Sequence, residues 1–196
     1  MDEEEIKPGY TRISRILGQF TSFDHINPDV LENKKNIGTN LHKGIQAELE
    51  DGFPFSIGQA EKGYFESWMK WKDAVHAEFE RWEERLYDDA LKLTGKFDAL
   101  VRLPNQTLPT LIDYKTSASP SHKTWEMQAH FYHYLLMQNR FTMLSDRFLW
   151  IQLNKHGFFP NVHIYTWNED MMNKCFQAVY SYYRLHPVDK NPDGKL

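Results

Sequence analysis

The sequence predicts a single α/β domain in which a mixed central sheet is flanked by helices. Segments with helical periodicity lie near both ends and in the middle of the chain, and segments with strand-like alternation lie between them. The predicted order is helix–helix–strand–strand–strand–helix–strand–strand–helix, which is typical of a mixed sheet covered by helices. The chain has 196 residues, 41% of them hydrophobic, which is enough to bury one core.

Two helices are predicted ahead of the strands. Residues 38–50 form the first, with Thr39 or Asn40 as the N-cap and Asp51-Gly52 as its end. Residues 61–80 form the second, because large apolar side chains recur there at helical spacing.

The ends of the chain predict less regular structure. Residues 1–37 are rich in turn formers, and Asn27-Pro28-Asp29 predicts a turn or a helix start. We expect 1–37 to be a partly helical extension that packs on a domain formed by 38–186. The tail, 187–196, contains proline and glycine and is expected to be loose.

Three strands follow the second helix. Residues 82–93 and 96–103 read as strands broken at Thr94-Gly95, and 104–106 form a turn. Residues 108–116 form the third strand. Consecutive short connections predict that these strands are neighbours in the sheet.

The second half repeats the alternation of helix and strand. Residues 124–139 predict a strong helix, and 147–153 and 162–167 predict two further strands. Asn168 is a suitable N-cap for a last helix that extends through Tyr183.

Composition limits the class of protein. The acidic start lacks the apolar segment of a signal peptide, and no stretch has the length of a membrane span. A single cysteine, Cys175, excludes an intrachain disulfide framework and favours a reducing, intracellular compartment. The net charge of −4 argues mildly against a nucleic-acid binder, but acidic runs at 2–5 and 78–84 hold much of the negative charge. The cations that could line a path for phosphates are Lys34, Lys35, Lys43, Lys115, Lys123 and Arg140.

Three charged side chains carry the predicted chemistry. Asp113 and Lys115 are two residues apart on one strand, so both face the same side of the sheet. Asp98, on a neighbouring strand, can supply a second carboxylate to that side. Carboxylates suit Mg²⁺ or Mn²⁺, in one or two ions, and a lysine beside a bound water favours hydroxide. An aspartate–lysine pair on an exposed strand is also common without any catalytic role, so the pair alone decides little.

The order of four short motifs resembles the RecB-like exonucleases of the PD-(D/E)xK superfamily, which include mitochondrial genome-maintenance, CRISPR-associated and phage relatives. The resemblance covers about residues 38–140 and implies a restriction-endonuclease-like fold. The motifs are Gly38-Thr39-Asn40-Leu41-His42, Gly95-Lys96-Phe97-Asp98, Asp113-Tyr114-Lys115 and Gln128-Ala129-His130-Phe131-Tyr132.

The resemblance assigns a role to each motif. Asp98, Asp113, His42 and the carbonyl of Tyr114 are expected to hold the metal, and Lys115 to assist the attacking water. A second set is expected to orient Lys115 or to touch DNA phosphates, and comprises Gln128, Tyr132 and Thr116. The alternative for Gln128 and Tyr132 is an ordinary amphipathic helix face, and for Thr116 a strand end is an equal explanation.

The chain departs from the fullest family pattern in two respects. The glutamate often found ahead of the Gly-x-x-Asp motif has three candidates, Glu80, Glu83 and Glu84, of which we prefer Glu84. Relatives with an iron–sulfur cluster need four cysteines, so no cluster is expected here. The chain also lacks the phosphate-binding loop of a nucleotide-driven motor, so no nucleotide cofactor is expected.

The resemblance implies a metal-dependent DNA exonuclease. We expect it to act on DNA with free ends or on single strands, in recombination, replication or end processing. A phage-like origin would place it in the cytoplasm of a bacterial host, with a possible recombination partner protein and no membrane. The alternatives are an endonuclease of the same superfamily, a catalytically silent DNA-binding module, and a structural protein whose acids and lysine form only surface pairs.

Overall fold

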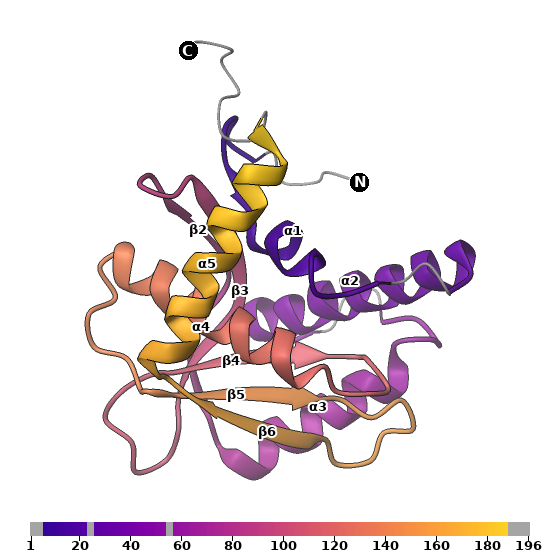
Figure 1. Ribbon diagram of the computed structural model, residues 1–196. Helices are drawn as coiled ribbons and strands as arrows, with labels where there is room; N and C mark the ends of the chain where they lie inside the picture. The colour runs from indigo at the N-terminus through magenta and orange to yellow at the C-terminus, as the bar shows by residue number, and fades with distance from the viewer. Residues whose placement is uncertain (1–5, 23–25, 54–56, 188–196) are drawn as a thin grey trace.

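The computed structural model describes residues 6–22, 26–53 and 57–187, which form six strands and five helices around one sheet (Figure 1). No helix among them is long and apolar enough to cross a membrane. In chain order the elements are β1 (Thr11–Arg12), α1 (Ile13–Gly18), α2 (Pro28–Asp51), α3 (Lys62–Val75), β2 (Glu78–Asp88), β3 (Leu93–Arg102), β4 (Thr110–Lys115), α4 (His122–Gln138), β5 (Arg147–Gln152), β6 (Asn161–Thr166) and α5 (Glu169–Leu185).

The sheet is mixed, as predicted. Its order is β1-β3-β4-β5-β6, and β2 pairs with β3 outside this path. The β1–β3 and β4–β5 pairs are parallel, whereas the β2–β3, β3–β4 and β5–β6 pairs are antiparallel. The helix α4 makes the crossover between the parallel strands β4 and β5.

One edge of β3 is shared by two strands that leave a gap between them. The other edge of β3 pairs along its length with β2, from Leu93 to Arg102. On the shared edge, β1 pairs with Leu93 and Thr94, and β4 pairs with residues 99–101. Within the described part of the chain, residues 95–98 therefore have no strand partner on that edge.

The two faces of the sheet are covered by different helices. The cluster under α1, α4 and α5 includes Phe97, Phe131 and Trp150, and the cluster under α2 and α3 includes Leu41 and Trp68. Figure 1 shows α4 and α5 on one side of the sheet and α3 on the other, with α2 extending beyond the strands. Burial of large apolar side chains on both faces is the main force that fixes the helices against the sheet.

The helix α2 begins ten residues earlier than expected. Asn27 is the N-cap, since its side chain accepts a hydrogen bond from the backbone N–H of Asp29, and Pro28 occupies the first turn. Thr39 and Asn40, predicted as caps, lie inside the helix, and the expected boundary at 37/38 falls in its middle. The predicted end is correct, because Gly52 caps the helix in the left-handed conformation with φ of 67°.

The boundary between the second helix and the first hairpin also differs from expectation. The helix α3 ends at Val75, and β2 already begins at Glu78. The hairpin turn lies at 89–92, where the Asp88 carboxylate accepts hydrogen bonds from the backbone N–H groups of Ala90 and Leu91. Thr94-Gly95, expected to break the strand, lies within β3.

Gly95 serves close packing and not a turn. A Cβ atom at this position would lie 2.7 Å from Ile13 Cδ1 and 2.7 Å from Tyr132 Cε1. Both contacts are shorter than atoms tolerate, so only glycine lets α1 and α4 approach β3 here.

The remaining elements agree with expectation to within about two residues. The helix α4 and the strands β4, β5 and β6 are present, and Asn168 caps α5 by accepting a hydrogen bond from the backbone N–H of Met171. The expected N-terminal extension contains β1 and α1, with Ile13 and Ile16 buried in the core. The expected loose tail lies, apart from residue 187, outside the described residues.

Leu41→Ala should destabilise the protein strongly. The Leu41 side chain is fully buried between α2 and the sheet, so its loss leaves a cavity that should lower the free energy of unfolding by about 2–5 kcal/mol. Val30→Ala is the control on the same helix, because Val30 is 50% exposed and its change should stay within about 0.5 kcal/mol. Urea unfolding followed by circular dichroism measures both, and equal effects would contradict the packing of α2.

Candidate active site

The gap on the edge of β3 contains Asp98, at the point where β3 and β4 cease to pair. The β3–β4 ladder ends at the pair Ala99 and Ile112. Beyond it, Asp98 Oδ2 accepts a hydrogen bond of 2.6 Å from the backbone N–H of Tyr114. The Asp98 side chain thus takes the place of the next hydrogen bond of the ladder. This contact fixes the carboxylate, which is buried with 8% of its surface exposed.

On β4, Asp113 and Lys115 face α4 and form a connected polar group with it. Lys115 Nζ lies 2.5 Å from Asp113 Oδ2 and donates a hydrogen bond of 2.9 Å to Gln128 Oε1. Gln128 Nε2 donates to Asp113 Oδ1 at 3.4 Å and to the Tyr132 hydroxyl at 3.0 Å. Gln128 therefore contacts Lys115 directly, and Tyr132 contacts Gln128.

A second group joins α2 to the hairpin of β2 and β3. His42 Nδ1 lies 2.8 Å from Glu83 Oε1 and 3.5 Å from Asp98 Oδ1. Lys96 Nζ lies 2.8 Å from the other oxygen of Glu83. His42, Glu83 and Asp98 each present a potential ligand atom, and these atoms lie within 4.8 Å of one another.

The structure places Glu83, and not the preferred Glu84, beside His42. The Glu83 side chain is 9% exposed and points to His42, whereas the Glu84 side chain is 36% exposed and pairs with Arg81. Glu83 has a left-handed backbone with φ of 52°, close to a register shift in β2 between Phe79 and Arg81. Such irregularities re-aim side chains, and alternation along a strand does not predict them. Glu80 pairs with Arg102 instead.

Burial and mutual repulsion perturb the acids of the site. Burial, together with the negative charge of Asp113, raises the pKa of Asp98 to about 8. Burial also raises the pKa of Asp113, although Lys115 opposes the shift. The pKa of Glu83 is lowered, because its contacts with His42 and Lys96 outweigh its burial. Burial alone would lower the pKa of His42, but Asp98 and Glu83 outweigh it and raise it to about 9.

This donor set fits a hard divalent cation. Three carboxylates and one imidazole converge in a space from which water is largely excluded, and their repulsion is relieved when a cation binds. Asp113 Oδ2 is buried and makes no well-aligned hydrogen bond, although Lys115 is close. His42, Asp98 and Glu83 form the closest set of donors among the described residues, and Asp113 lies next to it on β4.

Two residues of the site were missed by the sequence analysis. Glu83 was not the preferred glutamate, and Lys96 was not singled out, although it precedes Asp98 by two residues on the same strand. Tyr114 is buried, with its ring 6.2 Å from that of Trp68, and its backbone N–H serves Asp98. The metal-binding role of its carbonyl and the phosphate contact of Thr116 stay predictions.

Glu83→Gln should weaken Mn²⁺ binding, whereas Glu84→Gln should not. The change replaces an anionic ligand with a neutral amide and weakens the contact that orients His42, so the dissociation constant should rise roughly 10–100-fold. Glu84, the adjacent residue with the same side chain, is the matched control. Isothermal titration calorimetry of both variants decides the assignment, and equal affinities would refute it.

Metal binding should tighten as the pH rises from about 6 to 9. In the metal-free protein, Asp98 with a pKa of about 8 and His42 with a pKa of about 9 hold protons near pH 7. A metal needs both groups deprotonated, so it must displace these protons, and binding weakens as the pH falls. Calorimetry at pH 7 in two buffers of different ionisation enthalpy should show proton release. A pH-independent affinity would contradict the ligand set.

The fold and the family of the chain follow from its similarity to known proteins. A search of curated proteins found no match. Among solved structures, one of the matches is the "Putative exonuclease" from Eubacterium rectale, which is 11% identical and covers 100% of this chain and 88% of its own, with a TM-score of 0.58. A structure of SSO0001 is also 11% identical and covers 92% of this chain and 79% of its own, with a TM-score of 0.45. The family comparison matches residues 23–166, which is most of the chain. The chain belongs to the PD-(D/E)XK nuclease superfamily.

Proposed function

We propose that this nuclease hydrolyses phosphodiester bonds of DNA with Mg²⁺ or Mn²⁺ and that it acts from DNA ends. The observation that carries the proposal is the convergence of Asp98, Asp113 and Lys115 with His42 and Glu83 at the open edge of β3. Two neighbouring acids with a raised pKa, Asp98 and Asp113, are typical of a functional site.

Asp98, Asp113, His42 and Glu83 would hold the metal. When bound, the metal supplies a Lewis acid that polarises a phosphoryl oxygen and acidifies a water molecule. Asp98 is oriented by the backbone of Tyr114, and His42 is oriented by Glu83, so neither ligand depends on the metal for its position.

Lys115 would assist the attacking water. Its ammonium group is held in place by Asp113 and by Gln128, which in turn contacts the Tyr132 hydroxyl. A fixed positive charge beside the water favours hydroxide and stabilises the negative charge that develops on the phosphate oxygens. Gln128 and Tyr132 are therefore positioning residues for Lys115.

Action on DNA ends is supported by the chain's resemblance to RecB-like exonucleases and by the assigned name of the Eubacterium protein. A role in recombination, replication or end processing, in a bacterial host if the chain is phage-encoded, follows from the same resemblance. The intact acids and lysine disfavour a catalytically silent module. An endonuclease of the same superfamily is the second candidate, because both activities use the same acids and lysine.

Asp113→Asn and Lys115→Ala should each slow cleavage of linear DNA in Mn²⁺ or Mg²⁺ by roughly 10²–10³-fold, the usual effect of removing one charge-stabilising group. The first change removes a ligand and the second removes the cation beside the water. Asp73→Asn and Lys174→Ala are matched controls, since both residues are exposed and lie on α3 and α5 away from the site. Gel analysis of internally labelled single- and double-stranded DNA measures the rates.

Two results would contradict the proposal. Cleavage that persists in both active-site variants would refute the site, and wild-type protein that binds DNA without cleaving it would indicate a silent module. Covalently closed circular DNA decides between the two nuclease activities, because an exonuclease leaves it intact and an endonuclease cuts it.

A further inference from the structure

A cavity of about 350 Å³ adjoins the active site. It lies beside the unpaired residues of β3, with Gly95 and Lys96 in its wall. Side chains from β1, α1, α2, β2 and α4 complete the lining, among them Tyr132. The cavity therefore lies at the same gap in strand pairing that contains Asp98.

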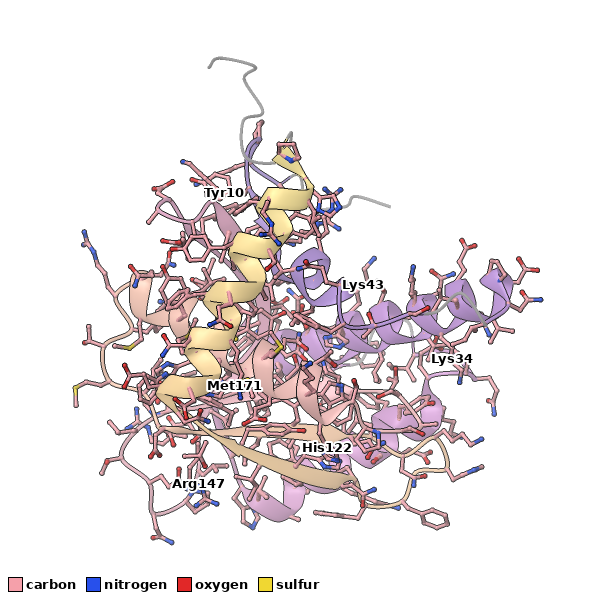
Figure 2. All side chains as sticks on the ribbon, viewed as in Figure 1. Tyr10, Lys34, Lys43, His122, Arg147 and Met171 are labelled. Atoms are coloured by element: carbon pink, nitrogen blue, oxygen red, sulfur yellow. The ribbon has the colours of Figure 1, made fainter. Side chains whose placement is uncertain are left out.

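The lining of this cavity is strongly basic. It contains Arg12, Lys43, Arg85 and Lys96, and no carboxylate belongs to the described residues that line it. Thr39 and Ser14 add hydroxyl groups. Lys43 is exposed, and Figure 2 shows it on the part of α2 next to α1. On a chain with a net charge of −4, a basic lining of this kind favours an anionic ligand, although Lys96 also pairs with Glu83.

Two of the sequence motifs each contribute to both sites. In the first, Thr39 lines the cavity and His42 belongs to the donor group. In the second, Gly95 and Lys96 line the cavity and Asp98 belongs to the donor group. Thr39 and Gly95 therefore have a place in the cavity wall, which metal binding alone does not explain.

Direct contacts join the cavity to the active site on both sides. Lys96 Nζ contacts Glu83, which contacts His42. Tyr132 receives a hydrogen bond from Gln128, which holds Lys115. A phosphate in the cavity would therefore be close to a second phosphate held at the metal site.

We propose that this cavity binds the terminal phosphomonoester of a DNA strand and so positions an inner phosphodiester for hydrolysis. The proposal rests on the proposed function and deepens it, because it names the chemical form of the DNA end. A phosphomonoester carries nearly two negative charges at neutral pH and three free oxygens, which suits this basic lining and its hydroxyl groups better than a diester with one charge. The volume, at the lower end for ligand pockets, suits one such group and part of its sugar.

The test compares three linear DNA strands of one sequence that carry a 5′ phosphate, a 3′ phosphate or hydroxyl groups at both ends. The label is internal so that both ends stay free. Cleavage rates are measured in Mn²⁺ and binding by fluorescence anisotropy in Ca²⁺. One phosphorylated end should be preferred by about tenfold or more over hydroxyl ends, in cleavage or in affinity, as expected for charge-assisted hydrogen bonds.

Lys43→Gln and the double variant Lys43→Gln, Arg12→Gln should reduce this preference towards one. Lys34→Gln, an exposed lysine of the same helix that does not line the cavity, is the matched control and should keep the preference (Figure 2). Lys96 is not changed, because it also holds Glu83. Circular dichroism confirms that each variant is folded.

Equal rates and affinities for all three strands would overturn the inference while leaving the nuclease assignment intact. A preference that survives the double variant would also overturn it, because the phosphate would then bind elsewhere. If no strand is cleaved, the proposed function fails, and the affinity ratio in Ca²⁺ still decides whether the cavity recognises a terminal phosphate.

Discussion

The site depends on one departure from regular pairing, the gap that β1 and β4 leave on the edge of β3. A continuous partner strand would satisfy residues 95–98 with backbone hydrogen bonds and would leave no room for ligands. Instead, the Asp98 carboxylate takes the N–H of Tyr114, and the space beside it holds the acids, the lysine and the basic cavity. The two helical layers keep this gap open, because each packs on its own apolar cluster.

Pairing with opposite charges and with a hydrogen-bond donor explains why the carboxylates of the site can be buried. Asp113 is matched by Lys115, Glu83 by His42 and Lys96, and Asp98 by a backbone donor. Each pairing offsets part of the cost of removing charge from water, but burial and the charge of Asp113 still raise the pKa of Asp98. A bound divalent cation would stabilise the ionised carboxylates, so the incomplete compensation of their charge favours metal binding.

The sequence predicted what depends on local pattern and missed what depends on tertiary packing. The order of elements and the mixed sheet were predictable from local pattern, and strand alternation placed Asp113 and Lys115 on one face. The meeting of His42 with Asp98 was implied only by the family resemblance. The start of α2 was not, since Asn27 and Thr39 are both suitable caps and packing selects the longer helix. The choice of Glu83 over Glu84 depends on a left-handed residue, which alternation cannot reveal.

Gly95 links the packing of the fold to the geometry of the chemistry. Its missing side chain leaves the space into which Tyr132 fits, and Tyr132 contacts Gln128, which holds Lys115. A methyl group at position 95 would push first against a tyrosine ring, and the displacement would be passed through two hydrogen bonds to the ammonium group. Gly95 therefore helps to determine the position of Lys115, although glycine has no side chain of its own.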